Sequence, residues 1–192
     1  MIKFIKRGGK LKMDTDNFFA NKSTLILPAF WVDDDHFPTE TPIETSLGQV
    51  FYEGYDGSAS HFGWMDLVLL NSLIKKNNVK KLIIQNLDVI GRAGLIYGNV
   101  IACTTYKYKQ NMTRIVPEND LVSCKPVYSI VSVGGWDFDE DTTEELPLAA
   151  KNYLRYILMA TKVHEVSYTC EHVSVTAFID ERGLPHFKEK YY

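Results

Sequence analysis

Several acidic stretches of the sequence contain residue types that bind divalent cations. Asp33, Asp34, Asp35 and His36 place three carboxylates and an imidazole on consecutive residues, and two of them could bind a metal with a ligand from elsewhere. Consecutive side chains rarely converge on one ion, and the acidic run at 137–145 lacks the glycine and the ligand spacing of a calcium loop. The histidines show no H-x-x-x-H or H-E-x-x-H spacing. We therefore expect solvated acidic loops and no metal site.

Motifs for covalent catalysis and for phosphate binding are also missing. There is no G-x-S-x-G segment, and no cysteine is marked as a nucleophile. The three cysteines (Cys103, Cys124 and Cys170) have no C-x-x-C spacing, which indicates free thiols in a reducing compartment. The segment 91–98, GRAGLIYG, is rich in glycine but lacks the lysine of a P-loop. We assign no catalytic residue from the sequence.

Composition limits the class of protein further. The 192 residues are 45% hydrophobic and 23% charged, with a net charge of -3, which is typical of one globular domain and gives no basic excess for nucleic acid or an anionic membrane. No apolar run approaches the ~20 residues that span a bilayer. The N-terminus lacks the apolar stretch of a secretory signal. We expect a cytoplasmic protein that contacts neither nucleic acid nor membrane.

The positions of apolar residues predict alternating strands and helices. Runs rich in β-branched and aromatic residues predict strands at 23–32, 81–87, 99–108, 127–133, 164–168 and 173–179. Apolar residues at helical spacing predict helices at 64–76 and 146–158. This alternation predicts one α/β domain at 23–180, with a mixed sheet and flanking helices. Residues 1–22 are expected to be a basic arm, either solvated or phosphate-binding, and 181–192 a polar tail.

Short segments, in order along the chain, match the motifs of one known family. They are 37–40 (FPTE), 62–68 (FGWMDLV), 86–90 (NLDVI), 124–128 (CKPVY), 135–136 (GW), 146–153 (LPLAAKNY) and 166–172 (VSYTCEH). Over roughly residues 30–175 the chain resembles the C-terminal half of adenylosuccinate synthetase, which uses GTP and aspartate to convert IMP to adenylosuccinate. The resemblance implies the α/β fold of that half.

The resemblance implies a nucleotide site around Asp88. The family's T-K-L-D aspartate corresponds to Asp88 and accepts hydrogen bonds from guanine, because a carboxylate pairs with both the N1–H and the exocyclic amine. A helix or turn cap is the alternative role for this carboxylate. Asn86 stands in place of the family's lysine. Ser167 lies in the segment that packs beside the base, where Thr169 replaces a glycine and its side chain would crowd a purine.

The family's aspartate-binding arginines are replaced in this chain. In the loop before the G-W-x-D-x-V segment, Ser58 and Ser60 occupy arginine positions, and His61 is the one candidate cation for a substrate. An arginine of a second loop has become Trp31. Each lost charge-assisted bond is worth about 1.5–3 kcal/mol, so two losses amount to about two to four decades of affinity. We expect that aspartate is not held in the family's manner.

The family's N-terminal half, which supplies phosphate binding and catalysis, has no counterpart in the resemblance. Three hypotheses follow. The first is a GTP-dependent ligase that joins an amine to a purine nucleotide with a partner subunit, using GTP and Mg²⁺ as candidate cofactors. The second is a module that binds a purine nucleotide without turnover. The third is an interaction or inhibitor protein that binds a protein partner, either as a homodimer or with a full-length synthetase-like chain.

Overall fold

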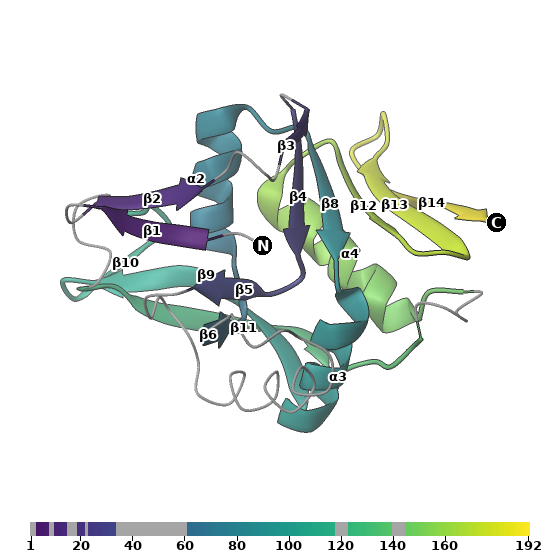
Figure 1. Ribbon diagram of the computed structural model, residues 1–192, viewed down its shortest axis with the longest axis horizontal. Helices are drawn as coiled ribbons and strands as arrows, with labels where there is room; N and C mark the ends of the chain where they lie inside the picture. The colour runs from purple at the N-terminus through teal and green to yellow at the C-terminus, as the bar shows by residue number, and fades with distance from the viewer. Residues whose placement is uncertain are drawn as a thin grey trace.

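The computed structural model describes residues 3–7, 10–14, 19–21, 23–33, 61–117, 123–139 and 145–192. Its largest sheet has six strands in the order β14-β13-β12-β8-β4-β3 (Figure 1). The central strands β12, β8 and β4 run parallel to one another, whereas β3, β13 and β14 join antiparallel at the two sides. The bounds are β3 Phe19–Asn21, β4 Thr24–Pro28, β8 Lys81–Gln85, β12 Glu165–Thr169, β13 Val173–Ile179 and β14 Pro185–Tyr191. The predicted mixed sheet with flanking helices is therefore confirmed.

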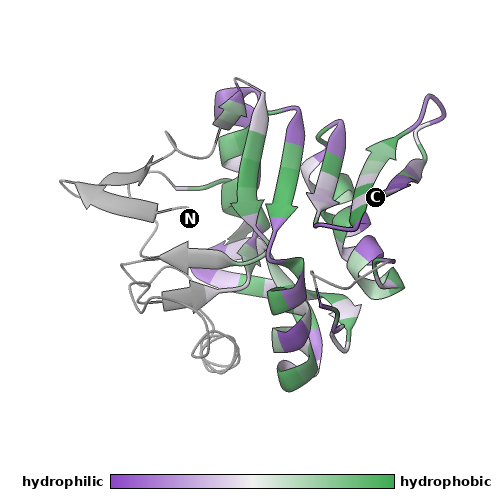
Figure 2. Ribbon diagram, turned by 45° about the vertical axis from the view of Figure 1, so that its right-hand side comes forward, coloured by the Kyte–Doolittle hydropathy of each residue, from purple (hydrophilic) through white to green (hydrophobic). Residues whose placement is uncertain are grey.

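One face of this sheet forms the main core of the molecule. Leu25, Leu82 and Val166 lie side by side on it, and none is more than 1% exposed. Helix α4 (Leu148–Thr161) packs against β12 and β13, and helix α2 (Leu67–Asn77) packs against α4. The hydropathy colouring shows most of β4 and the middle of β8 as apolar, whereas Lys81 and Gln85 make the two ends of β8 polar (Figure 2). Burial of this shared face is the main force that holds helices and strands together.

A second sheet is built on the long strand β9 (Asn99–Tyr108), which pairs antiparallel with β11 (Lys125–Val133) and β10 (Asn111–Thr113). The short strand β7 (Met65–Asp66) pairs parallel with β9. Two further antiparallel pairs are β1 with β2 (Lys3–Arg7 and Lys10–Asp14) and β5 with β6 (Trp31–Asp33 and His61–Gly63).

Helix α3 (Leu87–Tyr97) follows β8 directly and packs against β9. The sequence analysis places no helix there, because Gly91 and Gly94 lower helix propensity. In the structure a Cβ on Gly91 would overlap Trp136, and a Cβ on Gly135 would overlap the main chain of α3. The indole of Trp136 also donates to the carbonyl of Leu87 at 2.9 Å. The glycines of this segment allow close packing between helix and backbone.

Several predicted elements are confirmed and others are wrong. Strands 99–108 and 173–179 have the predicted bounds. The single strand predicted at 23–32 is two strands, because β4 ends at Pro28 and the chain turns before β5. The helix predicted from Trp64 begins at Leu67, because Met65 and Asp66 pair with β9 and Asp66 is the N-cap.

Both chain ends contain strands that the sequence analysis does not predict. Strands β1, β2 and β3 lie within the predicted N-terminal arm. Most of the predicted polar tail is β14, which pairs along its whole length with β13. Polar and charged residues are typical of edge strands, where one side of the strand faces water. This explains why composition alone indicated a tail.

Candidate functional site

The candidate site lies at the carboxyl edge of the parallel strands. Open α/β sheets commonly bind ligands at this edge, because the loops that leave parallel strands meet there. Strand β8 ends at Gln85, Asn86 follows, and α3 begins at Leu87 with Asp88 in its first turn. The sheet thus places Asn86 and Asp88 at the end of its central parallel group.

Strand register brings Thr169 to the same edge. Ser167 of β12 lies opposite Ile83 of β8 in the parallel ladder. The pairing of β12 with β8 ends there, and the two strands continue for two residues each, to Thr169 and Gln85. Asn86, Asp88 and Thr169 therefore all follow the carboxyl end of the parallel ladder, although Thr169 is distant from the other two in sequence.

Asp88 is largely buried, with a residue exposure of 9%, and forms an ion pair with Arg92. The Arg92 Nη2 atom lies 2.5 Å from Asp88 Oδ2. Within the described residues, no hydrogen bond joins the Asp88 carboxylate to a main-chain amide, although Asp88 lies in the first turn of α3. A carboxylate has about four lone-pair sites, so Asp88 retains acceptor capacity beside Arg92.

Arg92 is a site residue that the sequence analysis missed. It lies one turn after Asp88 on α3, at the i,i+4 spacing of helical ion pairs. Its Nε atom is buried and has no hydrogen-bond partner among the described residues, while its side chain as a whole is 43% exposed. The sequence shows an acid and a base four residues apart, but this spacing brings the two side chains together only if the segment is helical.

Asn86 has a backbone conformation that few residues adopt. Its φ of 55° and ψ of 42° lie in the left-handed region, which asparagine tolerates better than most residues. It occupies the N-cap position of α3, yet its side chain makes no capping hydrogen bond. The exposed amide is thus available at the carboxyl edge of β8.

The predicted β12 residues differ in their surroundings. Thr169 is exposed and its Oγ1 lies 2.9 Å from the Ser174 hydroxyl on β13. Ser167 is only 6% exposed, and its hydroxyl donates to the Leu82 carbonyl at 3.5 Å. Ser167 lies further back in the strand than Thr169, so Thr169 is the β12 residue at the edge itself.

The predicted substrate loop falls largely outside the described residues. Ser58 and Ser60 lie outside them. His61 is the first residue of β6, and its side chain lies outside them as well. The roles of Ser58, Ser60 and His61 stay predictions.

Metal binding and thiol chemistry have no candidate in the described part of the chain. It contains no group of three or more His, Cys, Asp or Glu residues able to hold a metal ion. Cys103, Cys124 and Cys170 are free thiols, and burial raises the pKa of the Cys103 thiol. A protonated, buried thiol is a poor nucleophile.

Of the helices in the described ranges, none has the length and apolar character needed to cross a membrane.

These features define an α/β protein with an open sheet and a candidate ligand site at the carboxyl edge of its parallel strands. The family model for adenylosuccinate synthetase matches residues 31–175. The chain therefore belongs to the adenylosuccinate synthetase family.

Comparison with individual proteins gives the extent of the similarity. The adenylosuccinate synthetase of Clostridium novyi is 33% identical over 144 residues, which cover 68% of this chain and 32% of that protein. The enzyme of Clostridium kluyveri is 36% identical over 118 residues, covering 58% and 26%. A fully ligated adenylosuccinate synthetase from Plasmodium falciparum shares the fold, with a TM-score of 0.57 and 21% identity over 73% of this chain and 36% of that one. The chain spans about a third of the length of these relatives.

Proposed function

We propose that this protein functions in purine nucleotide metabolism and binds a guanine-type nucleotide at the carboxyl edge of β8. Asp88 is the residue that recognises the base. Its carboxylate accepts the N1–H and the exocyclic amine of guanine, a pairing that adenine does not offer at the same edge.

The observation that carries this proposal is the environment of Asp88. The carboxylate is mostly shielded from water but has no main-chain hydrogen bond among the described residues. Hydrogen bonds to charged groups are stronger where water is excluded. Arg92 contacts one oxygen of the carboxylate and fixes its orientation from one side. Asn86 supplies an uncharged amide close to the position of the base.

The proposal covers recognition of the base and not phosphate chemistry. The described residues contain no P-loop and no carboxylate cluster for Mg²⁺. We propose that any joining of an amine to the purine uses a partner subunit that supplies phosphate binding.

Calorimetry with GTP and ITP on the parent protein and on Asp88→Ala tests the base contact. ITP lacks the exocyclic amine, so we expect the parent to bind GTP about 10-fold more tightly. Asp88→Ala should lose this preference and weaken GTP binding by about 10–100-fold. Glu181→Ala, an exposed acid in the β13–β14 turn, is the matched control. The same GTP preference in Asp88→Ala would remove this residue from the site.

Catalysis is tested separately by GTP hydrolysis with IMP and amine donors, with and without candidate partner chains. Turnover that appears only with a partner supports the ligase hypothesis. Nucleotide binding without turnover in every combination favours a binding module.

A second candidate function is protein binding, and it rests on strand β11. Among the described strands, β11 is at an edge of its sheet, and it exposes Ile130 by 57% and Val133 by 85%. An exposed apolar edge strand is a template for pairing with another chain. A second copy of this chain is the simplest partner. Light scattering should then give a dimer for the parent and a monomer for the double variant Ile130→Lys, Val133→Lys.

A further inference from the structure

A cavity of about 400 Å³ lies at the opposite end of the sheet from Asp88. It is partly open to solvent and is bounded by the C-terminal end of α4, the residues that lead into β12, and the turn between β13 and β14. The lining residues are Leu158, Met159, Lys162, Val163, His164 and Ile179, with Gly183 in the turn.

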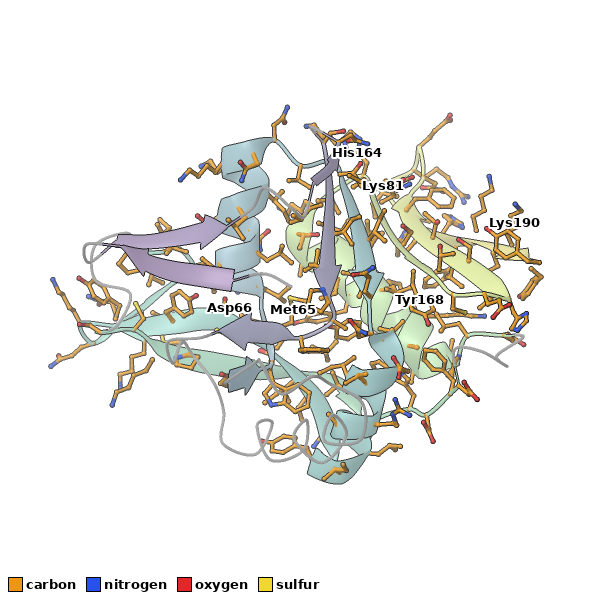
Figure 3. All side chains as sticks on the ribbon, viewed as in Figure 1. Met65, Asp66, Lys81, His164, Tyr168 and Lys190 are labelled. Carbon is orange, nitrogen blue, oxygen red and sulfur yellow. The ribbon has the colours of Figure 1, made fainter. Side chains whose placement is uncertain are left out.

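The cavity is separate from the candidate nucleotide site. His164 immediately precedes β12, and its main-chain amide donates to the carbonyl of Lys80 at 2.8 Å, just before β8 begins. Figure 3 shows His164 beside Lys81 at this amino end of the strands. Asp88 lies beyond the other end of β8, and five residues of strand span roughly 16 Å. The cavity and the candidate nucleotide site therefore lie at opposite ends of β8.

The walls of the cavity are held by hydrogen bonds that main-chain amides donate. At the end of α4, the amide of Lys162 donates to the carbonyl of Leu158 at 2.9 Å. In the turn, Asp180 Oδ1 accepts the amides of Arg182 and Leu184, each at 2.9 Å. Gly183 has a φ of 79°, a conformation that strains other residues. Both walls are thus formed before any ligand binds, which lowers the entropic cost of binding.

The lining combines apolar and basic groups. Leu158 and Val163 are almost completely buried, while Met159 is 51% exposed. Lys162 and His164 are the polar side chains among the lining residues, which include no carboxylate. The nearby Asp180 carboxylate is engaged within the turn by Arg182 at 3.0 Å and His186 at 2.9 Å.

We propose that this cavity binds an aliphatic carboxylate. The chain of the ligand packs on the accessible side chains of Met159 and Ile179, and its carboxylate pairs with the ammonium group of Lys162. The volume falls in the range of small-molecule pockets, which are mostly apolar with a few polar groups that fix orientation. Met159 adapts to the ligand, since its side chain is flexible and exposed at the cavity.

Octanoate is the probe that tests this site, with octanamide as its uncharged counterpart. We expect saturable octanoate binding with a dissociation constant of about 0.1–1 mM, seen by calorimetry and by shifts of the Met159 methyl and His164 ring signals. Octanamide should bind about 10-fold more weakly. Lys162→Gln should weaken octanoate binding by about 10-fold, whereas Lys76→Gln, an exposed lysine in the last turn of α2, should not.

Asp88→Ala should bind octanoate like the parent, so this test is independent of nucleotide binding. Absence of saturable binding would overturn the proposal. Equal affinities for octanoate and octanamide, or signal shifts in residues away from the cavity, would overturn it too.

Discussion

The hydroxyl of Tyr106 donates a hydrogen bond to Oδ2 of Asp66 at 2.5 Å, and both residues are at most 1% exposed. The other carboxylate oxygen of Asp66 accepts the amide of Leu69 at 3.0 Å and so caps α2. One buried carboxylate thereby joins strand β9 to the start of a core helix. The aspartate of the G-W-x-D-x-V segment has a structural role in this chain.

Tyr106→Phe should destabilise the protein in a pH-dependent manner. At pH 8 the variant leaves an ionised, buried carboxylate without its strongest donor, at a cost of about 1.5–3 kcal/mol. At pH 4.5, where the Asp66 carboxyl is protonated in the fold, the cost should fall to about 0.5–1.5 kcal/mol. Urea unfolding at both pH values measures this, with Tyr97→Phe as control. Equal costs at the two pH values would contradict it.

Asp66→Asn should remove a pH dependence of stability. Burial raises the pKa of Asp66 to about 6, although the bonds from Tyr106 and Leu69 oppose this rise. The folded state therefore binds a proton between about pH 4 and 6 that the unfolded state has released, near pKa 3.9. Stability falls by about 3 kcal/mol across that interval and is constant above it.

The difference in unfolding free energy between the parent and Asp66→Asn isolates this group from other titrations. It should shift in favour of the variant by about 3 kcal/mol from pH 4 to pH 7. Asparagine also caps helices well, so the cap itself is retained. Parallel pH profiles for the two proteins would show that Asp66 titrates normally in the fold.

Gly91→Ala should destabilise the protein although alanine favours helices. Helix propensity alone would stabilise the variant by about 1 kcal/mol. The added Cβ overlaps both the ring and the main-chain oxygen of Trp136, and such overpacking costs about 1–3 kcal/mol or more. We expect a net loss in thermal or urea unfolding. Ile96→Ala, at an exposed position of the same helix, should change stability by less than about 1 kcal/mol.

Arg92→Ala should weaken guanine nucleotide binding by about 3–10-fold, because Arg92 orients the Asp88 carboxylate. Stability should change by only about 0.5 kcal/mol, as for other helical ion pairs. Arg92→Lys should restore part of the affinity, which a purely structural role would not require. Tighter GTP binding by Arg92→Ala in calorimetry would instead mean that Arg92 competes with the base.

Lys151→Met should loosen strand β14. Lys151 is 8% exposed and pairs with Glu189 at 2.9 Å and with Glu145 at 3.1 Å. Burial alone would lower the pKa of Lys151, but the two carboxylates outweigh it and raise the pKa. Loss of the lysine leaves Glu189 without its cation, at a cost of about 1–3 kcal/mol.

Hydrogen exchange reports this effect locally. Amides of β14 should exchange faster in Lys151→Met and at the parent rate in Lys188→Met, a control at an exposed position of the same strand. Unchanged protection of β14 in Lys151→Met would mean that the pairing with β13 alone holds the strand.

The sequence alone was enough to predict those helices and strands whose pattern of apolar residues is visible within the element itself. Strands β9 and β13 have continuous β-branched and apolar character, and α4 has apolar residues at helical spacing. These patterns are set by the period of each backbone conformation. They were therefore predictable before any partner was known.

Only the tertiary structure decided the remaining helices, strands and contacts, because each of them depends on residues that are not visible as partners in the sequence. The glycines of α3 lower its helix propensity. The reason for them is visible only in the fold, where Trp136 and Gly135 pack against the helix too closely for a Cβ atom. The polar residues of β14 form a strand because β13 offers an unpaired edge and Lys151 binds Glu189. In the same way, the sequence pointed to Asp88, but only the fold brought Arg92 within 2.5 Å of its carboxylate. Hydrogen bonds and ion pairs between residues depend on distances that the chain acquires only when the helices and strands pack together.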